Sequence, residues 1–475
     1  MTVPPTSTNA SFAAILMPYM QVFYVSFLAT LALTPLMRRL ALKHGVVDEP
    51  DGTRKIHTNR IAYLGGVAIF IGWLLGVLAS ITVTPLNVNA SQFAEVQVPP
   101  GIMLGAGIVM ICGLIDDVYS LSPRIKLFGQ LLAAACLFFL NLTRADNIGA
   151  RIDLANMFVF PLERHHLLGI VQLTAPNTYM TLASMFSALF CVFIIMATSN
   201  AMNLLDGMDG LCGGVAGIMA VGYLFLSVYL ASANLTQPGI ASLNPARITL
   251  SLALLGAVLG FLPFNFNPAT IFMGDTGSMF LGFVCGAMII LFGNDGIFRW
   301  FLASVVIFGL PLLDTLLAVV RRKINGRPIF SPDSGHFHHF LLKRGLSVTR
   351  ATLVSYALAA MFVSFALVIV IIPTTLALGI YMVLFGWLVV AAFKMGMIHQ
   401  DGGVPLQAAS TVFVLSAQTV PGESAGATVL RDAPAAPNAG VAVPSPAAAP
   451  GIVPPAASRI HGGTTTHLKP DVVGS

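Results

Sequence analysis

The sequence predicts an all-α, polytopic integral membrane protein, and three features of its composition and patterning lead to this interpretation. Hydrophobic residues make up 56% of the 475 residues, charged residues only 9%, and the mean hydropathy is +0.85. A soluble domain carries about 25% charged residues. Apolar runs approaching the ~20 residues of a transmembrane helix recur along the chain, and polar residues gather between them. These features exclude an ordinary soluble domain.

Eleven apolar runs follow one another along the first 400 residues, and each is expected to form one transmembrane helix. They lie at 13–36, 62–84, 101–115, 127–143, 181–199, 211–231, 248–264, 278–292, 298–320, 351–372 and 375–393. From about residue 401 the chain becomes rich in Ala, Pro, Gly, Val and Ser, a composition that cannot build a packed core. We therefore expect a membrane domain over 1–400 and a Pro/Ala-rich disordered tail over 401–475.

The basic residues predict the orientation of this domain. The loops at 37–61, 116–126 and 321–350, together with Lys394, contain sixteen of the 24 Lys and Arg residues, and the loops on the opposite side contain five. Cytoplasmic loops carry the excess of Lys and Arg. We expect the N-terminus outside and the tail in the cytoplasm. The net charge of +5 then needs no nucleic-acid partner.

Four polar stretches interrupt the apolar runs, and this orientation places all of them in cytoplasmic loops. They are "DDVYSLSPRIK" at 116–126, "NAMNLLDGMDGL" at 200–211, "NFNPATIFMGDTGS" at 265–278, and the segment 321–345 that contains "HFHH". Loops that are distant in sequence but share one membrane face can contribute to one site. We therefore expect a single cytoplasmic active site.

Carboxylates dominate the first two stretches. Asp116 and Asp117 are adjacent and repel each other, so they need a cation, a proton or hydrogen-bond donors, although a solvated helix end would also explain them. Asn203, Asp206 and Asp209 are spaced i, i+3, i+6 and would line one side of a helix. The neighbouring glycines suggest instead a turn that lets the backbone approach a ligand.

The other two stretches suggest a metal ion and a phosphate. Asp275 could cap the following helix, but with Asn203 it also supplies the oxygen ligands that Mg²⁺ prefers, with Mn²⁺ as an alternative. His336, His338 and His339 could bind zinc. No cysteine accompanies them, which argues against zinc. Their i, i+2, i+3 spacing better suits a loop that binds phosphate.

These residue types together indicate phosphoryl transfer around a divalent cation. The sequence contains no P-loop, which argues against simple ATP hydrolysis. The acceptor is expected to be a membrane lipid because so many spans surround the site. A transporter or channel is the alternative class. Its acids would lie near midspan or within internal repeats, whereas the motif acids here lie at span ends and only Asp314 lies inside a span.

The four stretches also resemble a known family. "GLIDD…K", "NxxNxxDGxDGL", "NPAxxFMGDxGS" and "HxHH", in this order over residues 20–395, resemble the polyprenyl-phosphate N-acetylhexosamine-1-phosphate transferases. This family includes the enzymes that transfer GlcNAc-1-phosphate to undecaprenyl phosphate and the phospho-MurNAc-pentapeptide transferases. "HFHH" followed by "LLKRGLS" is closer to the GlcNAc branch. The other branch, or another UDP-N-acetylhexosamine, is the alternative.

The resemblance implies a role for each motif residue. Phe272 would stack on uracil near Gly207 and Asp209, and Asp116 and Asp117 would handle the acceptor phosphate. One departure concerns the basic loop "RKIHTNRIAYLGG", in which Ala62 and Tyr63 stand where the family usually has a proline before "LGG". The implied catalytic residues are Asp116, Asp117, Asp206, Asp209, His338 and His339; the implied substrate-binding residues are Lys55, His57, Lys126, Gly207, Phe272 and His336; and the implied Mg²⁺ ligands are Asn203 and Asp275.

The implied reaction is attack by undecaprenyl phosphate on the β-phosphate of UDP-GlcNAc with release of UMP. Its product would be the first lipid-linked intermediate of a cell-envelope polysaccharide such as a cell-wall polymer or lipopolysaccharide O-antigen. We favour direct attack over a covalent phosphosugar-aspartyl intermediate. The acceptor-handling acids and the metal ligands come from different loops of this site, so we expect them to have different roles. Asp275→Asn should weaken Mg²⁺ binding, whereas Asp116→Asn should lose activity but still bind UDP with Mg²⁺. The resemblance implies a location in the bacterial plasma membrane. The oligomeric state stays open, and a homodimer is one of the assemblies that the sequence allows.

Overall fold

The computed structural model describes residues 12–48, 60–82, 98–142, 176–232, 243–294, 297–326, 328 and 335–394. The predicted tail at 401–475 and the loop that carries Lys55 and His57 lie outside the described residues. The roles assigned to them from the sequence remain predictions.

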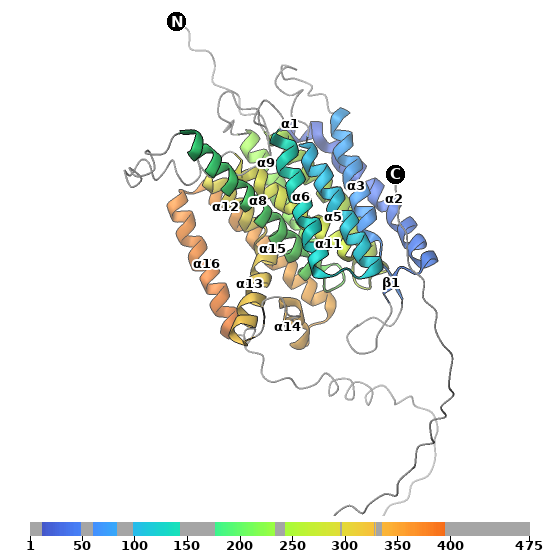
Figure 1. The fold of residues 1–475 in the computed structure, drawn as a ribbon. Helices are drawn as coiled ribbons and strands as arrows, with labels where there is room; N and C mark the ends of the chain where they lie inside the picture. The colour runs from blue at the N-terminus through green and yellow to red at the C-terminus, as the bar shows by residue number, and fades with distance from the viewer. Residues whose placement is uncertain are drawn as a thin grey trace, which may run out of the picture. The chain divides into compact units, whose positions relative to one another are not determined.

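The structure is an α-helical membrane bundle, and the described residues include one small β-hairpin (Figure 1). The hairpin pairs β1 (Val47–Asp48) with β2 (Ile61–Ala62) in antiparallel register. The helices are α1 (Phe12–Leu16), η1 (Met17–Tyr19), α2 (Met20–His44), α3 (Gly65–Ala79), η2 (Ser80–Thr82), α5 (Pro100–Tyr119), α6 (Pro123–Leu142), α8 (Pro176–Leu205), α9 (Leu211–Ser232), α10 (Asn244–Asn265), α11 (Gly274–Gly293), α12 (Phe298–Ile307), α13 (Gly309–Ile324), α14 (Phe337–Lys343), α15 (Val348–Ile371) and α16 (Thr374–Lys394).

The predicted class is confirmed, because a helix or a consecutive group of helices occupies each of the eleven apolar runs. Among the described residues, seven helices are long and apolar enough to cross a membrane, or eight if α12 and α13, bent by 75°, form one span. Two further apolar helices, at Gly65–Ala79 and Leu378–Val390, are shorter. The count of eleven spans therefore remains a prediction.

Four of the motif residues lie in helix ends, although the sequence placed their segments in loops, and the turn between α8 and α9 contains Asp206, Gly207 and Asp209. Helix α5 continues past its apolar run, so Asp116 and Asp117 form part of its last turn, and it ends where Ser120 adopts a left-handed φ of 52°. Asn203 lies in the last turn of α8, and Asp275 is the second residue of α11. The apolar runs underestimate the helices because backbone hydrogen bonding continues into the polar turns.

Helix α11 is the centre of the bundle, and the whole of its apolar window is buried. It packs against α8, α5, α3 and α12, while α10 packs against α2, α9 and α3. Glycines allow close approach of these backbones, as is usual where membrane helices touch. Gly113 faces the backbone of Thr276, and Gly282 faces the backbone of Thr198 and Ser199.

The close approach of α8 and α11 leads to a first prediction. A Cβ at position 282 would lie directly against the backbone of α8, so Gly282→Ala must push the two helices apart. Overpacking of this kind costs about 1–3 kcal/mol. We expect a lower Tm in detergent solution.

Gly217→Ala on α9 is the matched control for Gly282→Ala. Its added Cβ would meet Cγ1 of Val258 at 3.5 Å, an ordinary contact, so its Tm should equal or exceed that of the wild type. Equal Tm values for the two variants would contradict the proposed packing of α8 on α11.

Candidate active site

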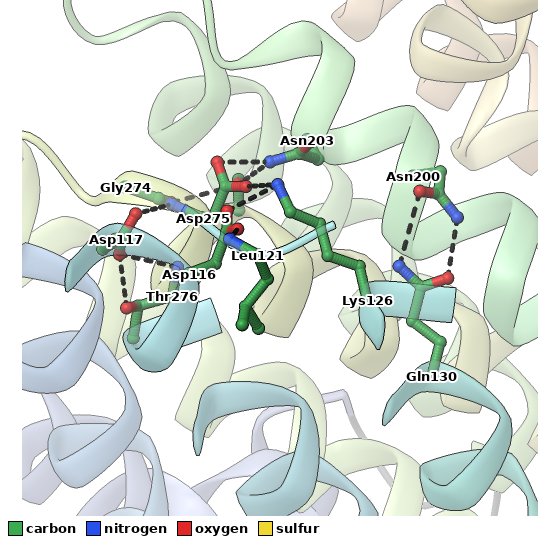
Figure 2. A network of polar contacts seen from close by, with 11 residues as sticks. Asp116, Asp117, Leu121, Lys126, Gln130, Asn200, Asn203, Gly274, Asp275 and Thr276 are labelled. Carbon is green, nitrogen blue, oxygen red and sulfur yellow. Dashed lines mark hydrogen bonds and ion pairs between the residues drawn. The ribbon is translucent and has the colours of Figure 1, made fainter. Parts of the chain in front are cut away.

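Four helix ends meet around one lysine (Figure 2). Nζ of Lys126, in the first turn of α6, lies 2.5 Å from Oδ2 of Asp116 and 2.6 Å from Oδ2 of Asp275. Asn203, at the end of α8, donates from Nδ2 to Oδ1 of Asp275 at 2.9 Å and to Oγ of Ser278 at 3.0 Å. The ammonium thus bridges two carboxylates that come from different helices.

The adjacent acids Asp116 and Asp117 point to different partners. Oδ1 of Asp116 accepts a hydrogen bond from the backbone N–H of Leu121 at 2.7 Å, while its other oxygen faces Lys126. Asp117 accepts from the backbone N–H groups of Asp275 and Thr276 at 2.8 and 3.0 Å, and from the Thr276 hydroxyl. These N–H groups have no partner within their own helix. Asp117 therefore caps the N-terminus of α11 from a neighbouring helix and holds Asp275 beside Lys126.

A second set of contacts joins the turn after α8 to the segment after α10. Oδ2 of Asp209 accepts from Nδ2 of Asn267 at 2.9 Å and from the backbone N–H of Ala269 at 3.0 Å. Gly210, with a φ of 73°, donates its N–H to Oδ1 of Asn265 at 3.2 Å. The Asp209 side chain therefore binds loop groups, and it orients the segment that leads to the predicted uracil-stacking residue.

That residue, Phe272, is fixed by the hairpin that precedes α3. Its N–H donates to the carbonyl of Ala62 at 2.8 Å, its carbonyl accepts from Gly65 at 3.0 Å, and its ring centroid lies 6.0 Å from that of Tyr63. The departure from the family pattern at Ala62 and Tyr63 thus lies directly beside a predicted nucleotide contact.

Asp206 lies near three other carboxylates. Burial raises the pKa of Asp206 well above its usual range, and the nearby carboxylates of Asp275, Asp117 and Asp209 raise it further. The raised pKa favours the protonated, neutral form of Asp206, whereas a divalent cation at this cluster would favour its ionised form.

The donor set decides how a metal ion could be held. Among the described residues, no group of three or more His, Cys, Asp or Glu side chains has the arrangement of a metal site. Magnesium commonly binds through one or two carboxylates plus substrate phosphates. Asp275 and Asn203 fit that pattern by chemical type, with Asp116 close enough to Asp275 to share Lys126.

The histidine motif reaches the same region from α14. The ring of His338, 2% exposed, lies directly against Gly207, and neither of its ring nitrogens has a hydrogen-bond partner among the described residues. Burial lowers the pKa of His338 to about 3, and the neighbouring His339 and His336 act in the same direction. His338 is therefore neutral at physiological pH. His339 lies beside it, with ring centroids 4.1 Å apart.

The structure thus brings together Asp116, Lys126, Asn203 and Asp275, and it places His338 against Gly207. Because Lys126 contacts both Asp116 and Asp275, the acids assigned to the acceptor and the ligands assigned to the metal lie at one place, and their separate roles remain a prediction. Two further features were missed by sequence reasoning. Asp314 contacts the histidine motif, and an amide pair, Gln130 with Asn200, lies one helical turn from the site. Gln130 lies four residues after Lys126, and Asn200 lies three residues before Asn203. These helical spacings were the available signal for the amide pair.

The amide pair links α6 to α8 (Figure 2). Nδ2 of Asn200 donates to Oε1 of Gln130 at 2.7 Å, and Nε2 of Gln130 lies 3.4 Å from Oδ1 of Asn200. Gln130 is fully buried. Because Lys126 lies on the same helix as Gln130, and Asn203 on the same helix as Asn200, this pair keeps the two Asp275 partners at a constant separation.

This fold and site define a class of protein. It is a multi-pass helical membrane protein with carboxylates, a lysine and histidines gathered at its helix ends. Residues 100–293 match the family described as "Glycosyl transferase family 4". A Bacillus subtilis protein named "Probable undecaprenyl-phosphate N-acetylglucosaminyl 1-phosphate transferase" is 32% identical over 380 residues, which cover 80% of this chain and 92% of that protein.

Two other relatives come from mycobacteria. The "Decaprenyl-phosphate N-acetylglucosaminephosphotransferase" of Mycolicibacterium smegmatis is 31% identical over 67% of this chain and 74% of that protein. The "Phospho-N-acetylmuramoyl-pentapeptide-transferase" of Mycobacterium leprae is 30% identical over 67% of this chain and 87% of that protein. The chain belongs to the polyprenyl-phosphate N-acetylhexosamine-1-phosphate transferase family.

The amide pair leads to a second prediction. Gln130→Leu removes both amide contacts and leaves Asn200 without its cross-helix partner. Interhelical hydrogen bonds in membranes contribute about 0.6–2 kcal/mol. We expect a lower Tm and a lower kcat for transfer, because Lys126 and Asn203 lose their common restraint.

The exchange variant Gln130→Asn with Asn200→Gln keeps the combined length of the two side chains and should recover much of both losses. A Gln130→Leu variant with wild-type kcat would show that the amide pair does not position the site.

A third prediction follows from the low pKa of His338. The unfolded chain takes up a proton near pH 6.5, whereas the folded protein does so only near pH 3. Lowering the pH from 6.5 toward 3 therefore lowers the free energy of unfolding, because over this range the unfolded chain binds a proton at His338 and the folded protein does not. His338→Gln should flatten the dependence of unfolding free energy on pH by about 1.4 kcal/mol per unit between pH 6 and 4. Parallel curves for wild type and variant, from thermal unfolding at several pH values, would contradict this assignment.

Proposed function

We propose that this protein transfers GlcNAc-1-phosphate from UDP-GlcNAc to undecaprenyl phosphate and releases UMP. The observation that carries the proposal is the Lys126 ammonium between Asp116 and Asp275, at the meeting point of four helix ends. The name and the 92% coverage of the Bacillus subtilis relative support the choice of both substrates.

In this reaction an oxygen of the lipid phosphate forms a bond to the β-phosphorus of UDP-GlcNAc. The bond from that phosphorus to the oxygen that bridges the α- and β-phosphates breaks, and UMP leaves with the electron pair. The product is a polyprenyl diphosphate that carries GlcNAc, and it serves as the first lipid-linked intermediate of a cell-envelope polysaccharide.

The site residues divide this work between them. An ammonium has three donor hydrogens. Two of those on Lys126 face Asp116 and Asp275, so the third is free to bind a phosphate oxygen. Asp116 orients the lipid phosphate or takes up its proton, and Asp117 acts through its cap on α11. Phe272 supplies an aromatic face for the uracil, and His338 packs against Gly207 beside the carboxylates, with both of its ring nitrogens buried.

Asn203 and Asp275 would hold Mg²⁺, or Mn²⁺ in its place, and a bound ion would offset the charge that develops on the leaving UMP. We place the site on the cytoplasmic face of the bacterial plasma membrane, with the N-terminus outside, because the basic residues cluster in the loops on that side. We also propose a homodimer.

The choice of sugar leads to a fourth prediction. "HFHH" followed by "LLKRGLS" favours an N-acetylhexosamine without a lactyl-pentapeptide. Purified protein with undecaprenyl phosphate should release labelled UMP from UDP-GlcNAc, and at least about tenfold more slowly, or about 1.4 kcal/mol in barrier, from UDP-MurNAc-pentapeptide. Turnover of UDP-MurNAc-pentapeptide with none of UDP-GlcNAc would place the protein in the other branch. Loss of UMP release from both donors would overturn the proposed activity.

The mechanism of attack leads to a fifth prediction. Asp116 already binds Lys126 and the Leu121 N–H, an arrangement that suits positioning of the acceptor better than nucleophilic attack. Without a lipid acceptor, wild-type protein given UDP-GlcNAc should therefore release no stoichiometric burst of UMP. A burst of about one UMP per site would instead show a covalent phosphosugar-aspartyl intermediate.

A further inference from the structure

Asp314 is a buried acid for which the proposed reaction has no role. It lies in α13, is 3% exposed, and faces the N-terminal end of α14. Helix α13 follows α12 with a bend of 75°, and its residue Asp314 contacts the histidine motif. A buried carboxylate is costly unless it is paired and hydrogen-bonded.

Both oxygens of Asp314 are used by the start of the histidine motif. Oδ2 lies 2.9 Å from Nδ1 of His336, and Oδ1 accepts the backbone N–H of Phe337 at 2.7 Å. The same face of α13 carries Arg321, whose guanidinium lies directly against Gly335. The residue just before the motif and its first two residues are therefore all held by α13.

These contacts determine which nitrogen of His336 can meet a ligand. An ionised carboxylate only accepts hydrogen bonds, so Nδ1 of His336 carries a hydrogen when it bonds Asp314. Nε2 is the ring nitrogen that remains. The His336 ring stacks nearly parallel to that of His338, with an interplanar angle of 5°, and His338 itself packs on Gly207 beside the carboxylate cluster.

We propose that Asp314 is a positioning residue for the transfer reaction, which holds His336 so that Nε2 contacts a phosphate group of the substrates. This inference rests on the proposed function. The carboxylate at Nδ1 fixes the orientation and tautomer of the ring, and Nε2 would form a hydrogen bond with a phosphate group, so each contact strengthens the other. Asp314 acts only through His336 and does not touch the substrates.

A double-mutant cycle tests whether the two residues act together. The four proteins are wild type, Asp314→Asn, His336→Gln and the double variant, and the measurement is kcat and KM for UMP release from UDP-GlcNAc with undecaprenyl phosphate. Asp314→Asn should lower kcat/KM at least tenfold in the wild-type background and less than twofold in the His336→Gln background, because coupled residues are not additive. Equal losses in both backgrounds would overturn the inference.

Nuclear magnetic resonance of protein with ¹⁵N-labelled histidine gives a readout that does not require a folded Asp314 variant. The chain has ten histidines, and the His336 signal is identified by its loss in His336→Gln. In wild-type protein the His336 Nδ1 should carry a hydrogen-bonded proton. A neutral His336 protonated only at Nε2 would overturn the inference even if Asp314→Asn fails to fold.

Thr315→Val is the matched control. It changes the neighbouring residue of α13, whose hydroxyl donates to the carbonyl of Pro311 in its own helix and has no other hydrogen bond among the described residues. It should leave both kcat/KM and the His336 signal unchanged. An inactive wild type would refute the proposed function, whereas an active wild type with an uncoupled Asp314 would refute only this inference.

Discussion

The ion pair network of Lys126 with Asp116 and Asp275 is the interaction on which the rest of the site depends. Two partly buried carboxylates that contact the same lysine would repel each other without it. The ammonium between them replaces this repulsion with two attractive contacts. The carboxylates and the ammonium belong to three helices, so the network forms only where the ends of α5, α6 and α11 meet. Asn203 adds the end of α8 to the same point.

The surrounding structure keeps these ends in place by different means at each level. Asp117 caps α11 by accepting the N–H groups of Asp275 and Thr276, and it so fixes the position of Asp275. One turn away, Gln130 and Asn200 hold α6 against α8. Further along the bundle, glycines let the backbones of α8 and α11 touch. In lipid, packing and interhelical hydrogen bonds must replace the hydrophobic drive that joins helices in water. The charged site is therefore supported by apolar helix packing and by a small number of interhelical hydrogen bonds.

Much of this architecture could be predicted from the sequence. The apolar runs locate the helices, and the motif order locates the site, because hydropathy and residue type are local properties. The partners of each side chain were not predictable in the same way. Lys126 lies 149 residues from Asp275, and Asn203 lies 72 residues from it. Asp116 and Asp117 are neighbours in sequence, yet one meets a lysine and the other a helix terminus, since adjacent residues of a helix point in directions about 100° apart. Asp314 was recognised only as an acid within a span, because its partner lies in a segment with no helical signal of its own.

The central claim is that Lys126, held between Asp116 and Asp275, is part of the catalytic centre of the transferase. Lys126→Met keeps most of the side-chain volume and removes the charge, so it tests this claim most directly. The measurement is UMP release from UDP-GlcNAc with undecaprenyl phosphate, with Tm recorded on the same preparation. We expect a loss in kcat/KM of at least about 100-fold, equivalent to about 2.7 kcal/mol of transition-state stabilisation, in a protein that remains folded. A folded Lys126→Met variant with activity within twofold of the wild type would contradict the account.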